Sequence, residues 1–293
     1  MKKRIGFVGL GLMGSGMATN LLSAGYPLIG YDLDKGKVEA IIQKGGKGID
    51  NPEDLPLEVD VIAMSLPNSH IVNNVVTKSL KLFDKGRTGL IVIDATTADP
   101  SMSEELSSGL RKKGIEMLDA TISGTSKRCA EKDITIMVGG NEEVFIECKD
   151  IFSSIAKEAL FMGKNGTGAM AKLIVNLVLD LNRMALAEGL ALSKKAGIDQ
   201  YRILEVLKKS AAYSKAMDDR GLKMIEKDFL PPVSRMSNTL KDVQLIMDFA
   251  KRLNFPLPLL SVHGQALLSE VAKGRGEYDS SDIISFYEDL ASI

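Results

Sequence analysis

The chain has 293 residues, enough for two domains of ordinary size, and its 45% hydrophobic and 26% charged residues are the balance of a globular protein. A formal net charge of −1, with lysine and arginine spread along the chain, excludes a global field that attracts nucleic acid or an anionic membrane. The two cysteines form neither a disulfide framework nor a CxxC metal site, so we expect a reducing compartment: the cytoplasm, or an organelle matrix. The polar continuation of the N-terminus argues against a signal peptide, and no apolar run is long enough to span a bilayer.

Short apolar runs alternate with helical segments through the first half of the chain. The helical segments, such as residues 14–25 and 101–114, end at a glycine, and one more helix is predicted at residues 141–156. Because the strands are continuously apolar, this alternation predicts a parallel sheet that helices cover on both faces. The predicted strands are residues 4–10, 27–32, 59–66, 89–95, 115–122 and 133–140.

The first predicted turn carries the spacing G-x-G-x-x-G, with a strand before it and a helix after it. Gly9 allows the tight turn, Gly11 lets the backbone approach a pyrophosphate at the helix N-terminus, and Gly14 permits close packing of helix on strand. Leu12 and Met13 lie between these glycines and are assigned to the same cofactor loop. A glycine-rich turn without a ligand is the alternative. The context favours a Rossmann-type, doubly wound dinucleotide-binding domain over residues 1–163.

Asp32 ends the second predicted strand, about 18 residues beyond Gly14, near the position where an acidic residue is expected. A carboxylate there accepts hydrogen bonds from the hydroxyls of the adenosine ribose. It also repels a 2′-phosphate, so NAD is favoured over NADP. A solvated carboxylate at a strand end is the alternative interpretation.

The pattern changes after about residue 165, and all later segments are helical in character. Residues 168–196 form a long predicted helix that is apolar nearly all round, so we expect it to be buried on most sides. Gly197 is its expected C-cap. We therefore predict an all-α domain for substrate and oligomerisation over residues 164–293, joined to the first domain by this long helix.

Two polar residues, Lys172 and Asn176, lie inside the apolar helix of the segment GKNGTGAMAKLIVNL. They are four residues apart and share one helix face. Thr167 is a possible N-cap, and Gly168 a position where substrate or cofactor could approach the backbone. A partly desolvated lysine has a lowered pKa and exchanges a proton near neutral pH, while an amide at i+4 orients it or holds a substrate oxygen. The alternative is a lysine whose stem packs while its amine reaches water.

The order of motifs resembles that of the β-hydroxyacid dehydrogenase family, which includes 3-hydroxyisobutyrate dehydrogenases and tartronate and succinic semialdehyde reductases. The resemblance covers nearly the whole chain. Residues 6–21 resemble the dinucleotide motif of that family, and residues 119–140 resemble its substrate segment, D-A-P-V-S-G-G and a following strand. Residues 163–176 match its catalytic motif, G-x-x-G-x-G-x-x-x-K-x-x-x-N, at every fixed position, and residues 239–260 resemble its late K-D-L motif and P-x-P.

The resemblance implies a role for each matching residue. Lys172 is implied as the catalytic general acid/base, and Asn176 as a residue that binds and orients substrate. Ser123 and Gly124, with Thr125 beside them, are implied to hold the substrate carboxylate. The implied cofactor contacts beyond the glycine loop are Lys241 of the late motif and four residues lining the cleft near the nicotinamide: Leu66, Pro67, Asn68 and Thr96. For the last four, a turn after a strand or a helix cap is the alternative interpretation.

Departures from the family pattern concern the substrate segment. Thr121 and Thr125 replace the proline and the second glycine of the family, and Lys132 stands where a glycine is common. Lys127 and Arg128 make the loop more basic, although a solvated charge pair is the alternative. Ser234 stands where an aromatic residue is frequent. We expect these positions near the acyl end of the pocket, where they leave the substrate open. Sulfolactaldehyde reductases of the family also carry a Thr-Ser pair here, which makes a sulfonate aldehyde the alternative substrate.

The expected function is that of an NAD-dependent oxidoreductase for a small 3-hydroxy acid or its semialdehyde, acting as a homodimer or homotetramer. No metal is expected, because the two histidines, His70 and His263, have no partners at metal-ligand spacing. Three alternatives are weaker. A non-catalytic nucleotide-binding scaffold would tolerate loss of Lys172, an imine reductase usually lacks that lysine, and a 6-phosphogluconate dehydrogenase needs a longer helical domain.

Overall fold

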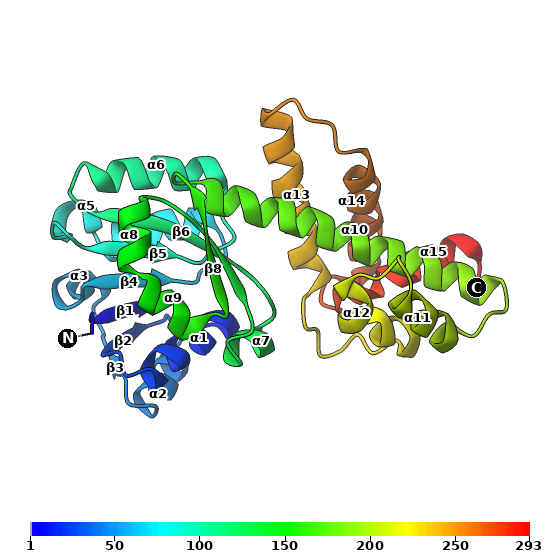
Figure 1. The fold of residues 1–293 in the computed structure, drawn as a ribbon, viewed down its shortest axis with the longest axis horizontal. Helices are drawn as coiled ribbons and strands as arrows, with labels where there is room; N and C mark the ends of the chain where they lie inside the picture. Colours follow the sequence, from blue (N-terminus) through cyan, green and yellow to red (C-terminus); the bar gives the residue numbers. More distant parts are fainter. Residues whose placement is uncertain (1) are drawn as a thin grey trace. The chain divides into compact units, whose positions relative to one another are not determined.

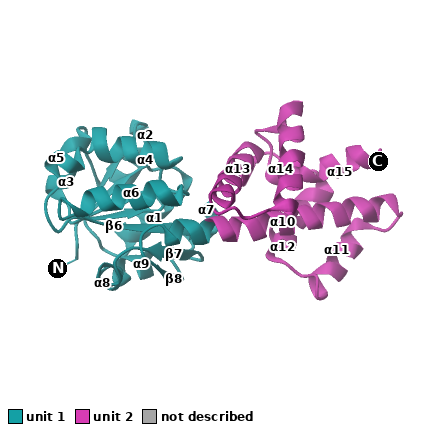
Figure 2. Ribbon diagram, turned by 90° about the horizontal axis from the view of Figure 1, so that it is seen from above, with its two compact units in different colours: residues 1–172 teal, residues 173–293 magenta. Residues whose placement is uncertain are grey.

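The computed structural model describes residues 2–293, which divide into two compact units at the peptide between Lys172 and Leu173 (Figure 2). Each unit has hydrophobic clusters of its own. Within residues 2–293, no helix has the length and apolar character needed to cross a membrane.

The first unit is built on one eight-stranded sheet with the order β3-β2-β1-β4-β5-β6-β7-β8 (Figure 1). All neighbouring strands are parallel except β6 and β7. The order reverses direction between β1 and β4, as in a doubly wound sheet, which confirms the predicted Rossmann-type fold. The strands are β1 (Ile5–Val8), β2 (Leu28–Tyr31), β3 (Lys47–Gly48), β4 (Val61–Met64), β5 (Ile91–Asp94), β6 (Glu116–Ser123), β7 (Thr135–Gly139) and β8 (Glu158–Gly163).

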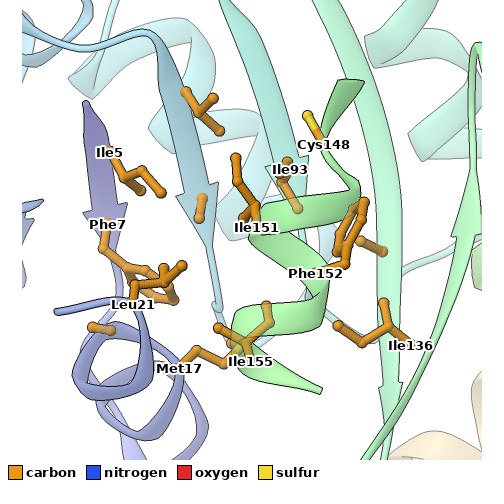
Figure 3. Close-up of a cluster of buried hydrophobic side chains, with 14 of the residues drawn as sticks. Ile5, Phe7, Met17, Leu21, Ile93, Ile136, Cys148, Ile151, Phe152 and Ile155 are labelled. Atoms are coloured by element: carbon orange, nitrogen blue, oxygen red, sulfur yellow. The ribbon is translucent and has the colours of Figure 1, made fainter. Parts of the chain in front are cut away.

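Helices cover both faces of this sheet, which explains why its central strands are continuously apolar. Phe7 and Ile93 pack into the cluster on one face, where Figure 3 shows Leu21 and Phe152 against them. Alternate residues such as Ile62 pack into the cluster on the other face. The helices are α1 (Leu12–Ser23), α2 (Lys35–Ile42), α3 (Leu55–Glu58), α4 (Ser69–Asn74), α5 (Leu82–Lys85), α6 (Pro100–Arg111), α7 (Ser126–Ala130), α8 (Glu142–Glu147) and α9 (Lys149–Ile155).

The first unit differs from the prediction in three ways. The helix predicted at residues 141–156 is two helices, α8 and α9, that meet at Cys148. Strand β7 runs antiparallel to β6, because the connection over residues 124–134 contains only the short α7 and is too short for a typical parallel crossover. Strands β3 and β8 were not predicted, since β3 has two exposed residues and β8 is an edge strand that is never fully buried.

The second unit contains helices and, apart from them, an isolated β-bridge between Arg235 and Asp279. Helix α10 (Thr167–Lys195) enters this unit from the first. The helix ends as predicted, because Gly197 has a positive φ of 74° and its N–H donates to the carbonyl of Lys194. One stripe of α10, which includes Ile174 and Val178, is exposed at the surface of the chain. The other helices are α11 (Gln200–Lys209), α12 (Lys215–Glu226), α13 (Met236–Arg252), α14 (Pro258–Glu270) and α15 (Ile283–Ala291).

Candidate active site

One row of residues crosses the sheet where its parallel strands end. Backbone pairing sets Val8 opposite Met64, Met64 opposite Asp94, and Asp94 opposite Asp119. In doubly wound sheets this carboxyl edge is where ligands bind. Several of the predicted cofactor residues follow the row directly: Gly9 follows Val8, Asp32 follows Tyr31, Leu66 comes two residues after Met64, and Thr96 comes two residues after Asp94.

Two glycines of the first loop are required by the fold itself. Gly9 has φ +88°, and a Cβ on it would lie 2.4 Å from the carbonyl oxygen of Ser65. A Cβ on Gly14 would lie 1.9 Å from the carbonyl oxygen of Gly9. Gly11 differs, because a Cβ there would have no atom of residues 2–293 within 4 Å. The fold leaves open space in front of Gly11, which suits close approach of a ligand to the backbone.

The start of α1 has the properties of an anion site. Gly11 is its N-cap, no side chain of residues 2–293 caps it, and its first turn contains no acidic residue. The first N–H groups and the positive end of the helix dipole therefore remain available to a phosphate. Leu12 is exposed beside them, and Met13 packs partly against the core. The residues of this loop fit a dinucleotide pyrophosphate.

Asp32 has a structural role that the sequence did not indicate. One carboxylate oxygen accepts the N–H of Leu10 at 2.7 Å, and the other accepts the N–H of Asp34 at 2.9 Å. The ammonium of Lys37 lies 3.6 Å away. A carboxylate has about four acceptor sites, so Asp32 can hold the glycine loop and still accept a ribose hydroxyl.

The loops after β4 and β5 are fastened to each other by Thr96. Its buried hydroxyl oxygen accepts the N–H of Leu66 at 3.0 Å, and its own N–H donates to Asp94 at 3.0 Å. Asn68 caps α4 by accepting the N–H of Ile71 at 3.0 Å. Thr96 and Asn68 therefore shape these loops through bonds within the chain. Pro67, between Leu66 and Asn68, is exposed.

Asp94 and Asp119 are both buried, and their pKa values respond to burial. Desolvation, with a smaller contribution from the charge of Asp119, raises the pKa of Asp94 to about 6, although its hydrogen bonds with Thr96 oppose that shift. Desolvation also raises the pKa of Asp119, against the N–H groups of Gly166 and Ala169, which lower it. Asp94 and Asp119 are thus two neighbouring buried carboxyl groups in this row of the sheet.

The first turn of α10 is attached to β6 beside this row. The carboxylate of Asp119 accepts the N–H of Gly166 at 2.8 Å and the N–H of Ala169 at 2.9 Å. The hydroxyl of Thr121 donates to the carbonyl of Gly168 at 2.7 Å. A Cβ on Gly168 would lie 2.3 Å from the carbonyl oxygen of Asp119, so helix and strand meet backbone to backbone.

These contacts correct three details of the prediction. Thr167 is not the N-cap of α10: it is the first helical residue, and its hydroxyl donates to the carbonyl of Lys164 at 2.7 Å. Gly168 makes room for β6 instead of a ligand. Thr121, expected at the acyl end of the pocket, is fully buried and bonded to α10. The proline-to-threonine departure therefore has a structural explanation.

The other substrate-segment residues lie at the end of β6. Ser123 is the last residue of this strand, and by alternation its side chain shares a face with those of Asp119 and Thr121. Gly124 has φ +149°, and a Cβ on it would meet Ile134 at 2.5 Å. The hydroxyl oxygen of Thr125 caps α7 by accepting the N–H of Arg128 at 3.3 Å.

The basic pair of this loop divides into two environments. Lys127 is exposed, as the solvated alternative predicted. Arg128 instead forms an ion pair, with its Nε 2.9 Å and its terminal nitrogen 2.8 Å from the same oxygen of Asp133. The charge of Arg128 is thus matched within the chain.

In the second unit, Asn176 and Lys241 meet through a residue that the prediction did not assign. The amide nitrogen of Asn176 donates to Asp242 at 3.3 Å, and the ammonium of Lys241 lies 3.2 Å from the other oxygen of that carboxylate. Asn176 is buried, and Lys172, one helical turn earlier on α10, is partly buried. The K-D pair in the late motif was the signal that could have identified Asp242.

Two family models match the chain in succession. Residues 4–163 match the NAD binding domain of 6-phosphogluconate dehydrogenase. Residues 166–287 match the model described as NAD-binding of NADP-dependent 3-hydroxyisobutyrate dehydrogenase. Together the two matches account for both units.

Relatives named as hydroxyacid dehydrogenases match over almost their full length. The 2-(hydroxymethyl)glutarate dehydrogenase of Eubacterium barkeri is 32% identical over 290 residues, covering 99% of this chain and 96% of that protein. The L-threonate dehydrogenase of Cupriavidus necator is 29% identical over 288 residues, covering 98% of this chain and 97% of that protein. The crystal structure of 3-hydroxyisobutyrate dehydrogenase from Salmonella typhimurium is 28% identical, with a TM-score of 0.87 over 96% of this chain and 99% of that one.

Proposed function

Since the chain belongs to the β-hydroxyacid dehydrogenase family, we propose that it transfers a hydride between NAD and a small 3-hydroxy acid or the matching semialdehyde, with Lys172 as general acid/base. At the coarser level the chain is an NAD(P)-dependent hydroxyacid dehydrogenase. In the finer proposal, residues 1–163 form the dinucleotide-binding domain, and residues 164–293 form the helical domain for substrate and oligomerisation.

One observation supports this function above the others. The residues proposed to bind the cofactor follow a single register row of the sheet, and the first turn of α10 is bonded to that same row at Asp119. Lys172 follows Ala169, which donates one of these bonds, by three residues. Hydride transfer occurs at the hydroxyl-bearing carbon of the substrate and proton transfer at the oxygen bonded to it. The cofactor and the proton-transfer group must therefore be held in fixed positions relative to each other.

The proposed chemistry assigns one task to each residue. NAD, when bound, supplies the hydride acceptor. The hydroxyl of Ser123 and the backbone N–H groups at Gly124, with Thr125 beside them, hold the substrate carboxylate. In oxidation neutral Lys172 removes the hydroxyl proton, and in reduction its ammonium form donates the proton and stabilises the developing alkoxide.

Asn176 completes the proposed substrate site. Because its Nδ2 is held by Asp242, the amide has a fixed orientation, and its remaining polar groups are free to orient a substrate oxygen. Lys241 reaches the cofactor in this proposal. Cofactor choice follows from Asp32, whose carboxylate favours the ribose hydroxyls of NAD and repels the 2′-phosphate of NADP.

The test is turnover with a panel of 3-hydroxy acids and semialdehydes, including a sulfonate aldehyde, followed by NADH absorbance. We expect Lys172→Ala to lower kcat by about 10²- to 10⁴-fold while NADH binding is retained. Lys164→Ala, an exposed lysine of the same motif, is the matched control and should keep wild-type kcat. Near-normal kcat in Lys172→Ala would exclude the proposed acid/base role, and a higher kcat/KM with NADPH than with NADH would exclude the role of Asp32.

A further inference from the structure

We infer that Asp119 is a positioning residue for Lys172, because its carboxylate fixes the first turn of α10 to the row of the sheet that carries the cofactor loops. Nothing in the sequence motifs assigned Asp119 a role of its own. The inference rests on the proposed function, since it concerns the lysine to which proton transfer is assigned. It makes the rate of proton transfer depend on a side chain that does not itself touch the substrate.

The carboxylate of Asp119 holds the helix start at two points. Its two oxygens accept different backbone N–H groups, those of Gly166 and Ala169, at 2.8 and 2.9 Å. Gly166 directly precedes α10 and Ala169 lies in its first turn, where N–H groups have no intrahelical partner. Asp119 is only 1% exposed, so water does not compete for them. Two bonds to two residues fix both the axial position and the rotation of the turn.

Tight packing leaves this carboxylate a single position. A Cβ on Gly139 would lie 2.8 Å from each carboxylate oxygen of Asp119. A Cβ on Gly168 would lie 2.3 Å from the backbone carbonyl oxygen of Asp119. The hydroxyl of Thr121 adds a bond to the carbonyl of Gly168. Backbone therefore surrounds the group on both sides, and the helix cannot slide along β6 without breaking these contacts.

If the first turn of α10 were displaced, Lys172 would move by nearly the same distance. Lys172 follows Ala169 by three residues, which is less than one helical turn and about 4.5 Å along the axis. A regular helix transmits a rotation of its first turn to its next. Misplacing a reacting group by about 1 Å can cost about 10²-fold in rate. In the proposed function the cofactor is bound by the glycine loop between β1 and α1 and by Asp32 after β2, which belong to other elements than α10.

Asp119→Asn is the smallest change that tests the inference. The amide has the same shape, but it offers one acceptor oxygen and places an NH₂ against the second backbone N–H. One of the two bonds is therefore lost. We expect kcat to fall by about 10- to 100-fold, with KM and the Kd for NADH within about threefold of wild type.

Isotope effects separate positioning from a general loss of structure. Reduction is measured in H₂O and D₂O, with NADH and with NADH deuterated at the transferred hydrogen. If Lys172 is misplaced, proton transfer becomes rate-limiting and the solvent isotope effect on kcat rises. A variant that merely contains less folded enzyme loses activity with unchanged isotope effects. The matched control is Leu118→Val, for which unchanged isotope effects are expected. Leu118 directly precedes Asp119 on β6 and packs in the hydrophobic core.

A second variant covers the case in which Asp119→Asn does not fold. Thr121→Val removes the other bond to the same turn while preserving side-chain volume. It should lower kcat by about two- to fivefold with the same rise in the solvent isotope effect. If Asp119→Asn folds and has wild-type kcat and isotope effects, the inference about Asp119 is wrong, while the proposed function stands. If only Thr121→Val folds, wild-type values in that variant lead to the same conclusion. A wild-type enzyme that turns over no member of the panel would overturn the proposed function and this inference with it.

Discussion

Asn176 and Lys241 are joined through Asp242, which links α10 to α13 at the level of single side chains. The bond from Asn176 decides which end of its amide is presented to a ligand, because Nδ2 is already directed at the carboxylate. Asp242 is half of the late motif, yet only its neighbour Lys241 carried an expected role. A residue that orients another is recognisable only once their contact is known.

Asp242→Ala should therefore weaken substrate binding. We expect the substrate KM to rise about fivefold, which corresponds to the loss of one hydrogen bond of about 1 kcal/mol, while the Kd for NADH changes less. Steady-state kinetics with the best substrate of the panel measures this. Asp248→Ala, an exposed aspartate on the same helix, is the control. Equal KM values in wild type and Asp242→Ala would contradict the proposed orientation of Asn176.

At the scale of an element, α14 contains a buried group that makes its stability depend on pH. His263 is fully buried, and neither ring nitrogen has a hydrogen-bond partner within residues 2–293. Desolvation, with the nearby charge of Arg183, lowers the pKa of His263 from 6.5 to about 4. The folded state thus favours the neutral ring, and protonation must be accommodated by unfolding.

The expected result is a loss of stability on acidification. Because the pKa of His263 is lower in the folded state than in the unfolded state, its contribution to the free energy of unfolding is intact above pH 6.5. That contribution is lost as the pH falls toward 4, and the free energy of unfolding decreases by up to about 3 kcal/mol. Urea denaturation at pH 7.5 and pH 4.5 measures it, and His263→Leu should show a smaller difference between the two. His70→Ala, the exposed histidine, should behave as wild type. Parallel pH dependence in wild type and His263→Leu would rule out this origin.

Elements differ in how far their own sequence determines them. Six of the eight strands were predicted, and the clearest of them, such as Ile5–Val8, are continuously apolar because they are buried on both faces. Strand β8 has no fully buried residue, so its pattern carries little hydrophobic signal. The cap of α10 was assigned to Thr167, a local candidate, whereas Asp119 comes from a strand 47 residues before Gly166. Motif spacing indicates which residues react, but tertiary contacts such as this one decide what holds them.

At the scale of the whole molecule, unit 2 exposes apolar side chains on two of its helices. On α10, Ile174 and Val178 are 55% and 54% exposed, and on α14, Leu259 and Val262 are 66% and 56% exposed. Residues at i and i+4, or i and i+3, form a stripe along a helix. Apolar stripes of this kind are typical of surfaces between subunits.

We accordingly expect a homodimer or homotetramer in solution. Size-exclusion chromatography with light scattering should give two or four times the 31.7 kDa of the chain. The double variant Ile174→Asp and Val178→Asp should shift the protein toward the monomer, because charges in an apolar interface are costly to desolvate. Ile146→Asp, on α8 of unit 1, is the control. A wild-type protein that elutes as a monomer at micromolar concentration would contradict the expectation.

The passage of α10 through the boundary between the units has a consequence for how this chain can vary in length. Lys172 is the last residue of one unit, and Asn176 lies in the first turn of the next, yet both belong to one uninterrupted helix. Inserting a single residue between them would turn everything downstream by about 100° about the helix axis and lengthen it by about 1.5 Å. An exposed turn such as residues 43–46 can absorb an insertion, because its backbone has no such periodicity to preserve. Between Lys172 and Asn176, therefore, residues can be neither added nor removed without changing which side chains share a helix face.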